Sequence, residues 1–496
     1  MDMKCKRVAI LLTLLLVYTC LACGGTKYIS PLDFGLSNAQ TGEDRYDVLL
    51  RCHKQALKDN CYVTYKGIDS IILEIPATAT GIPLTDRTDF SGVTISVRNK
   101  MRDIYLFKRE SQLQPINLTA KQIDSGDMSS NDSLARGRYI VIIEDKKPWV
   151  DKRIGYDYPH IRQDILLVEN GRAKNTVVMP YGNDYSIPTC TYRRVTNIEK
   201  LFYNLHFFRT YDSTKKTGLI KIRGEHNIKL KDVYIYTPPK SDLYGDQVVA
   251  VEHGSCVTYE NVEVDGTYSK NDKYGYAFRL DNVWNYKASH VKANGNWGVY
   301  GTNNLNRVLL ENCEINRFDI HNYGRDVVLK NCRFFKLYNS FASTFGKVVF
   351  DHCVFEESIP YLNAGSYNTF VKVNVIFENC KFYLSTKNNF LVQMMGMRAN
   401  VNKRHEISEK HIPDIAIKNC EAFVPESVND WYILKLGSYS KNLIVEGANK
   451  IDVNHLTISG NTNSTVHLQT DKIELRTPFE VRTQKVYNNG RKTFIK

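Results

Sequence analysis

The sequence predicts an all-β solenoid of parallel strands, and three observations carry this prediction. First, one short motif returns along the chain from about residue 200, each time with a small or apolar residue at the same place. Second, successive copies are 19 to 40 residues apart, which is typical of solenoid coils. Third, the intervening segments are short runs of β-branched and aromatic residues without helical periodicity. The aligned positions are Leu205, Val233, Val262, Val291, Cys313, Cys332, Cys353, Cys380 and Cys420.

The repeated position also explains much of the cysteine content. Five of the twelve cysteines fall on it, so we expect them to stack as small buried residues instead of forming a disulfide framework. Asparagine precedes many of these positions, and we expect it to have a structural role along the turns. The sequence contains no glycine-rich phosphate loop and no zinc-type cysteine spacing.

The first residues are typical of an exported protein. Residues 1–22 read as a signal peptide, because three basic residues precede an apolar run that is too short to span a membrane. The segment Leu21-Ala22-Cys23 resembles the processing site of bacterial lipoproteins, which predicts lipidation of Cys23. We therefore expect an extracytoplasmic protein, either secreted or held as an outer-membrane lipoprotein on the cell surface or the periplasmic face. The lipid anchor is the only membrane contact expected.

Changes in pattern divide the mature chain into four segments. Residues 27–110 are expected to form an N-terminal cap and the first coils, since Arg45 to Lys58 has helical periodicity and alternating strands follow. Residues 111–200 contain a Ser-, Asp- and Asn-rich stretch and are expected to form early coils with a long loop. Residues 201–445 should form the parallel core with a groove, and residues 446–496 the C-terminal coils and tail.

The charge of the chain favours an acidic partner. Its net charge is +13 at neutral pH, and a basic exported protein attracts polyanions through its overall field. Nucleic acid is a poor candidate outside the cytoplasm, whereas a polysaccharide that carries uronate or sulfate groups fits. We expect the protein to act on such a polymer as a monomer.

The stretch from Asn316 to Asp326 is the strongest candidate site. If it is extended, apolar side chains face one side while Arg317, Asp319 and His321 face the other. The strand would therefore have an apolar back and an ionisable front.

Neighbouring coils are predicted to add three side chains to this front. Counting back from the repeated position in each coil predicts that Glu252, Arg279 and Tyr300 point outward. Stacked coils lie about 4.8 Å apart, so an arginine, a tyrosine and a histidine would lie within reach of one sugar.

This set of residues suits eliminative cleavage of a uronate polysaccharide. The reaction removes the proton from C5, beside the carboxylate, and expels O4, so it needs a cation, a base and an acid. Arg279, Arg317 or Arg325 can neutralise the carboxylate. His321 is the expected base, and Tyr300 or Tyr323 the expected acid. The residues expected to bind the substrate are Arg325, Asp319, Glu252, Trp297 and Lys292.

The chain resembles the pectate-lyase-like superfamily in the cap that begins at Asp33-Phe34-Gly35, the repeated motifs and the segment Arg317 to His321. More narrowly, it is similar to exported polysaccharide lyases of gut Bacteroidota, nearest to glycosaminoglycan lyases of the chondroitin sulfate type in polysaccharide lyase family 29. The resemblance implies a right-handed parallel β-helix with an N-terminal helix cap. It also implies β-elimination on a polymer such as chondroitin sulfate, dermatan sulfate or hyaluronan.

Other functions on such a fold stay open. The Trp-Ile-Asp-His and Arg-x-Pro-x-x-Arg motifs of pectate lyases are absent from the sequence, which counts against pectate. A glycoside hydrolase would need two carboxylates across the groove, for which Glu252 and Asp319 are the available pair. A non-catalytic polysaccharide-binding protein, similar to a phage tail spike, would bind without cleaving. No cofactor or metal ligand is predicted, and because no compact aspartate cluster marks a calcium site, dependence on calcium is left open.

Overall fold

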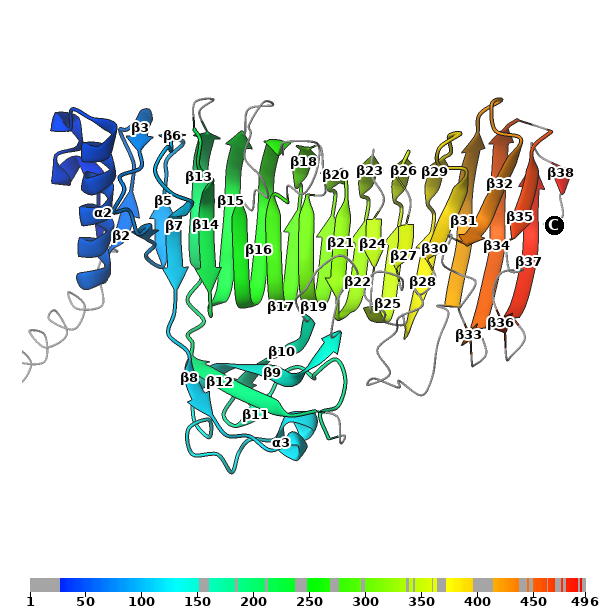
Figure 1. Cartoon of the computed structure of the whole chain (residues 1–496), viewed down its shortest axis with the longest axis horizontal. Coiled ribbons are helices and arrows are strands. Elements are labelled where there is room, and N and C mark those ends of the chain that lie inside the picture. The colour runs from blue at the N-terminus through cyan, green and yellow to red at the C-terminus, as the bar shows by residue number, and fades with distance from the viewer. Residues whose placement is uncertain are drawn as a thin grey trace, which may run out of the picture.

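The computed structural model is an elongated parallel β-helix with a helix at one end and a small subdomain at its side (Figure 1). A sheet of 31 strands winds around the long axis. The structure describes residues 27–150, 160–182, 186–209, 213–236, 248–267, 276–295, 299–335, 339–341, 344–358, 360–363, 372–395, 414–436, 444–445, 449–461, 463–468, 474–475, 479–488 and 491–492.

The coils have three faces, here called A, B and C. Face A is built from β14 (Thr217–Arg223), the first parts of β16 (Val249–Thr267), β17 (Phe278–Ser289) and β19 (Tyr300–Glu311), then β21 (Phe318–Asn322), β24 (Asn339–Phe341), β27 (Pro360–Asn363), β30 (Phe390–Met395), β32 (Asp430–Leu436) and β35 (Thr465–Leu468).

Face B follows face A in each coil, and face C completes the turn. Face B takes the first parts of β13 (Lys200–Arg209), β15 (His226–Tyr236), β31 (Asp414–Val424), β34 (Asn449–Gly460) and β37 (Phe479–Asn488), the middle of β16, the ends of β17 and β19, and β22 (Gly324–Lys330), β25 (Thr344–Asp351) and β28 (Lys372–Glu378). Face C takes the ends of β13, β15, β16, β31, β34 and β37, with β18 (Lys292–Gly295), β20 (Glu314–Ile315), β23 (Arg333–Phe335), β26 (Val354–Glu356) and β29 (Lys381–Tyr383). Two further short pairings lie towards the C-terminus, β33 (Ile444–Val445) with β36 (Glu474–Leu475), and β37 with β38 (Arg491–Lys492).

The parallel register accounts for the sequence repeat. Leu205 pairs with Val233, and Val233 pairs with Val262, so the repeated residues stack from coil to coil. All nine repeated positions are only 0–2% exposed, and the five cysteines among them are free thiols. The predicted parallel β-helix is confirmed.

The residue before a repeated position turns the chain from face B to face C. Asn312, Asn331, Asn379 and Asn419 have φ angles of 56°, 51°, 57° and 52°. Asparagine tolerates this left-handed region better than most residues with a side chain. These asparagines therefore shape a corner of the coil.

The helix α2 (Gly42–Lys58) covers the N-terminal end of the stack (Figure 1). Its start is fixed by a capping box, in which Thr41 Oγ1 accepts a hydrogen bond from the Asp44 amide and Asp44 Oδ2 accepts one from the Thr41 amide, both at 3.0 Å.

No helix in the described part of the chain is long and apolar enough to cross a membrane. The cap and first coils also contain β1 (Tyr28–Ile29), the 3-10 helices η1 (Pro31–Phe34) and η2 (Leu36–Asn38), β2 (Tyr62–Thr64), β3 (Ser70–Glu74), β4 (Ile82–Pro83), β5 (Arg87–Asp89), β6 (Thr94–Arg98) and β7 (Ile104–Glu110).

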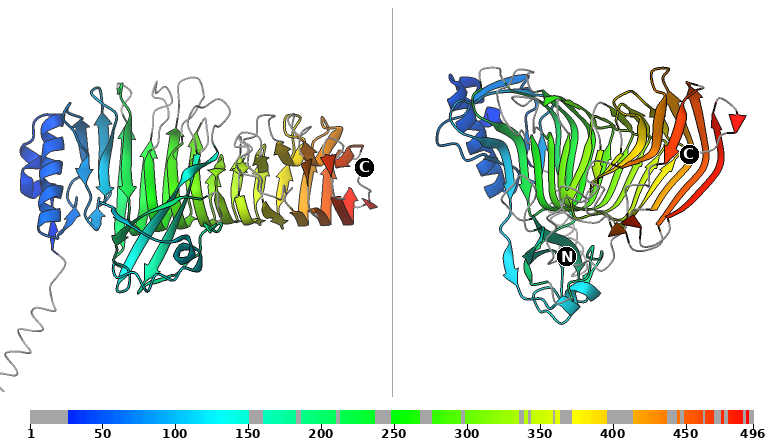
Figure 2. Two further views of the ribbon diagram at one scale, coloured as in Figure 1. Left: turned by 60° about the horizontal axis from the view of Figure 1, so that its bottom comes forward. Right: turned by 45° about the vertical axis from the view of Figure 1, so that its right-hand side comes forward.

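The segment after β7 leaves the coils and forms a subdomain, seen from two further directions in Figure 2. The prediction of early coils over residues 111–200 is therefore wrong for most of this range. The strands there pair with one another in an antiparallel sheet of order β11-β10-β9-β12-β8. The elements are β8 (Gln114–Ile116), α3 (Ala120–Ser125), β9 (Arg138–Val150), β10 (His160–Glu169), β11 (Arg172–Ala173) and β12 (Pro188–Arg194).

The subdomain sheet is buried on both faces. One face packs with Ile123 of α3 in a core that is separate from the β-helix core. The other face presents Ile140, Ile142 and Ile165 to Trp284 of the β-helix. This second contact fixes the subdomain against the coils that carry the candidate site.

Candidate active site

The candidate site lies on the outer side of face A, where the strand register brings four coils together. Ala250 pairs with Arg279, Arg279 with Gly301, and Gly301 with Asp319. The predicted residues Arg279, Asp319 and His321 thus come from β17 and β21, with β19 between them. The structure confirms that they share this face.

Asp319 is the buried centre of the group. Its side chain is 0% exposed, and its Oδ2 lies 2.5 Å from Arg317 Nη2 and 3.4 Å from His321 Nε2. Burial raises the pKa of Asp319, but the Arg317 charge and the contact with His321 outweigh burial and leave the pKa below its usual value. Asp319 is therefore an anion that holds Arg317 and His321 in place.

Tyr276, which sequence reasoning missed, completes the group. Its hydroxyl lies 2.8 Å from His321 Nε2 and 3.4 Å from Asp319 Oδ2. The ring lies over Gly301, where an added Cβ would be only 2.6 Å from Tyr276 Cγ. A glycine at an outward position of a strand was the signal in the sequence that another group fills this space.

A second set of polar groups flanks this cluster. Arg279 forms an ion pair with Asp281, which also accepts a hydrogen bond of 2.8 Å from Asn303 Nδ2. Asp281 pairs in register with Glu252, whose Oε1 lies 3.3 Å from Lys221 Nζ. The side chain of Arg279 is 39% exposed, whereas that of His321 is 14% exposed. Arg279 is the cation of the cluster that is most open to a ligand.

The prediction that Tyr300 points outward is wrong. Its side chain is fully buried in the β-helix core, and its hydroxyl is 2.8 Å from that of Tyr286. Tyr300 pairs with Phe318, which faces inward, so the outward position of this strand is Gly301. Burial raises the pKa of Tyr300 well above its usual value, which removes it as an acid at the surface.

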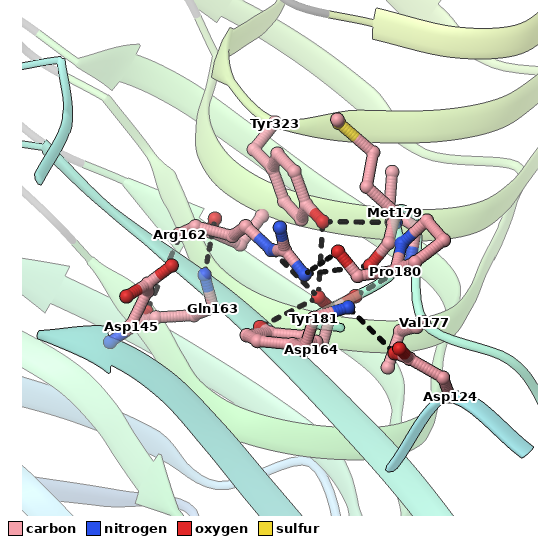
Figure 3. Close-up of polar contacts among 12 residues, drawn as sticks. Asp124, Asp145, Arg162, Gln163, Asp164, Val177, Met179, Pro180, Tyr181 and Tyr323 are labelled. Atoms are coloured by element: carbon pink, nitrogen blue, oxygen red, sulfur yellow. Dashed lines mark hydrogen bonds and ion pairs between the residues drawn. The ribbon is translucent and has the colours of Figure 1, made fainter. Parts of the chain in front are cut away.

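Tyr323 is fully buried and points toward Asp164 and Tyr181 of the subdomain (Figure 3). Its hydroxyl donates to Asp164 Oδ2 at 3.1 Å and accepts a hydrogen bond of 3.1 Å from the Met179 amide. Asp164 also accepts a hydrogen bond from Tyr181, at 2.9 Å, and burial raises its pKa to about 6 in spite of nearby Arg162. The assignment of Tyr323 as the acid is therefore wrong, because this hydroxyl is enclosed.

Three further predicted residues do not join the site. Arg325 lies in β22 on face B, and its side chain donates a hydrogen bond of 3.2 Å to the Val177 carbonyl of the subdomain. Lys292 is exposed on face C, where it pairs in register with Glu314. Neither residue therefore lies with Arg279, Asp319 and His321 on face A. Trp297 and Cys23 lie outside the described residues.

The described residues contain no group of three or more His, Cys, Asp or Glu side chains arranged to hold a metal ion. The site contains a tyrosine and a histidine in hydrogen-bond contact, a buried carboxylate behind them, and a partly exposed arginine two strands away on β17. Such a set can move a proton and oppose a negative charge.

Comparison with known proteins defines the class of the fold. No protein-family model matches the chain, and no curated protein matches it in sequence. The chain is similar to the solved tailspike protein gp49 of Pseudomonas phage LKA1, with a TM-score of 0.55 and 12% identity over 91% of this chain and 81% of that one.

It is likewise similar to the gp54 tailspike of Acinetobacter baumannii bacteriophage AP22, which was solved in complex with A. baumannii capsular saccharide. Here the TM-score is 0.54 and the identity 12%, over 93% of this chain and 76% of that one. At these identities the likeness shows a shared parallel β-helix fold.

Proposed function

We propose that the protein cleaves a uronate-containing polysaccharide by β-elimination on face A. The observation that supports this most is the 2.8 Å contact between the Tyr276 hydroxyl and His321 Nε2, beside Arg279, which follows Tyr276 on the same coil. This proposal keeps His321 as the base and gives Tyr276 the role of acid that buried Tyr300 and Tyr323 cannot fill. The net charge of +13 favours an acidic polymer.

In the proposed reaction, every proton that a residue gains or loses is restored by the end of one cycle. Arg279 opposes the carboxylate and so acidifies C5, and His321 takes the C5 proton. The electrons of that bond form the C4=C5 double bond, while the C4–O4 bond breaks and O4 takes the proton of Tyr276. The proton on His321 then passes to the Tyr276 oxygen across their hydrogen bond. Asp319 stabilises the charged imidazole between these steps.

The first experiment tests this reaction directly. Purified residues 24–496 are mixed with chondroitin sulfate, dermatan sulfate, hyaluronan, heparin and pectate, and the ultraviolet absorbance of the unsaturated product is followed. We expect a rise on one or more glycosaminoglycans, and its loss in Tyr276→Phe and His321→Ala with thermal unfolding nearly unchanged. No rise on any of the five polymers would refute the lyase.

A glycoside hydrolase is the second candidate, with a different pair of carboxylates from the predicted one. Glu252 and Asp319 are three strands apart, or roughly 14 Å at the usual strand spacing, which exceeds the separation that glycosidases use. Glu252 and Asp281 are register partners on adjacent strands, and carboxyl groups about 5 Å apart suit a retaining mechanism. New reducing ends without unsaturated product, lost in Asp281→Asn, would favour the hydrolase.

A binding protein without activity is the third candidate. The AP22 tailspike shows that a β-helix of this general shape can hold a saccharide. This candidate would be favoured if the protein were retained on an immobilised glycosaminoglycan and the polymer kept its length after long incubation. Tyr276, Arg279 and His321 would then contact the carbohydrate without cleaving it.

The proposed site of action is outside the cytoplasm. We propose that residues 1–22 are removed and that Cys23 is lipidated, as its sequence context predicts. Metabolic labelling with a radioactive fatty acid should mark the wild-type protein and not Cys23→Ala. Equal labelling of both would exclude this anchor.

A further inference from the structure

The subdomain contains a cavity of about 380 Å³ of its own, away from the contact with Tyr323. This volume is within the range of sites for small ligands. The cavity lies where β12 pairs with β8 and β9. Its walls come from Gln112, Gln114, Ser133, Tyr139 and Tyr192, with two arginines at the end of β12.

The two arginines differ in what they already bind. Arg193 Nη1 lies 2.7 Å from Glu225 Oε1 and 2.9 Å from the Gly224 carbonyl, so it ties the subdomain to the β-helix. Arg194 is exposed, and its side chain has no hydrogen-bond or ion-pair partner among the described residues. None of the described residues that line the cavity is acidic. Arg194 therefore offers a whole guanidinium to an anion.

The tyrosines form a wall beside this charge. The rings of Tyr139 and Tyr192 have centroids 5.8 Å apart and are inclined by 52°. The Tyr139 hydroxyl donates a hydrogen bond of 2.8 Å to the Arg136 carbonyl, which fixes its ring. Tyrosine gives large contact area at low entropic cost, and the two glutamines and the serine supply donors and acceptors for hydroxyl groups.

We propose that this cavity is a second saccharide site, which binds one acidic sugar unit without cleaving it. Arg194 pairs with the carboxylate or sulfate, one tyrosine ring packs on the sugar ring, and the glutamine amides contact its hydroxyls. The choice of polymer rests on the proposed function, while the site itself needs no cleavage. A chain long enough to occupy both sites would bind more tightly than a short oligosaccharide.

Calorimetric titration of residues 24–496 tests the proposal. The protein carries His321→Ala to prevent cleavage, and the probes are size-defined oligosaccharides of chondroitin sulfate and of hyaluronan, with a cello-oligosaccharide as neutral probe. We expect two sites for the acidic probes and no binding of the neutral one. Adding Arg194→Gln should weaken one site about tenfold or more, and Gln114→Ala should weaken the same site less.

Arg172→Gln is the matched control, because Arg172 is an exposed arginine of the same subdomain and lies outside the cavity. Binding of hyaluronan assigns the anion as a carboxylate, and binding of chondroitin sulfate alone assigns it as a sulfate. The proposal fails if Arg194→Gln changes nothing, if Arg172→Gln has the same effect, or if the neutral probe binds as well. Arg194-dependent binding, together with no ultraviolet product when the wild-type protein is incubated with the same polymers, would refute the proposed lyase and leave this site standing.

Discussion

At the scale of single residues, alternation in one strand was enough to find three of the four residues grouped around Asp319. Arg317, Asp319 and His321 could be predicted because alternate side chains of an extended segment share a side. Tyr300 could not be placed by counting between coils, because an error of one residue moves a side chain to the other face. Tyr276 reaches the site from the segment before β17, which no periodicity describes.

Gly301 is expected to be essential for the position of Tyr276. In Gly301→Ala the new Cβ would lie 2.6 Å from Tyr276 Cγ, so the ring must move and its hydroxyl must leave His321. Activity on the responsive polymer should fall about a hundredfold, toward the level of Tyr276→Phe, since a positioned acid contributes about this factor. The thermal midpoint should change little, because the displaced ring lies outside the β-helix core.

Steady-state rates of Gly301→Ala, Tyr276→Phe and the double variant give the control. If the glycine acts through the tyrosine, the double variant should be no slower than the slower single variant. Near-native activity in Gly301→Ala would show that the ring position does not matter to the reaction.

At the scale of elements, the helix α2 was predicted and the subdomain was not. The helical periodicity of Arg45 to Lys58 agrees with the observed Gly42–Lys58, which a capping box extends by one turn. The strands of the subdomain pair across distant parts of the chain, and local patterns do not encode such pairing. The apolar run Ile140 to Ile143 did carry a signal, because a strand without alternation is buried on both faces.

The cap should lose stability in acid because of His53. This histidine is buried, and its two ring nitrogens contact the Pro83 carbonyl at 3.0 Å and the Tyr65 hydroxyl at 2.9 Å. Burial lowers the pKa of His53 to about 4, from 6.5 for the ordinary side chain. Since the folded pKa is the lower one, the stabilisation is present above pH 6.5 and is lost as the pH falls toward 4.

Over this range the free energy of unfolding is expected to fall by about 3 kcal/mol because of His53. Thermal unfolding at several pH values measures this loss. His53→Gln is the comparison, because glutamine can contact the same two oxygens without titrating there. The wild-type protein should lose its advantage in free energy of unfolding over His53→Gln steadily as the pH falls. His226, whose pKa burial also lowers to about 4, is present in both proteins and cancels. A difference in free energy of unfolding that does not change with pH would contradict the proposed role of His53 in the acid instability.

At the scale of the whole molecule, the fold follows from the repeat while the chemistry does not. Nine repeated positions predict a stack of coils because each one must find a buried partner in the next coil. No such repetition constrains an active site, which gathers single residues from several coils and from the segments between faces. Tyr276 and Asp281 are of this kind: a side-chain contact from outside the strands places Tyr276, and the strand register places Asp281.

The column of cysteines gives a direct measure of how this stack opens. Cys313, Cys332, Cys353 and Cys380 are 0–1% exposed free thiols on successive coils, whereas Cys256 is partly exposed. A small alkylating reagent should therefore modify Cys256 in the native protein and leave the column unmodified. In rising denaturant, followed by mass spectrometry, neighbouring coils that unfold together should expose all four thiols at one midpoint. Separate midpoints would instead mean that the solenoid opens coil by coil.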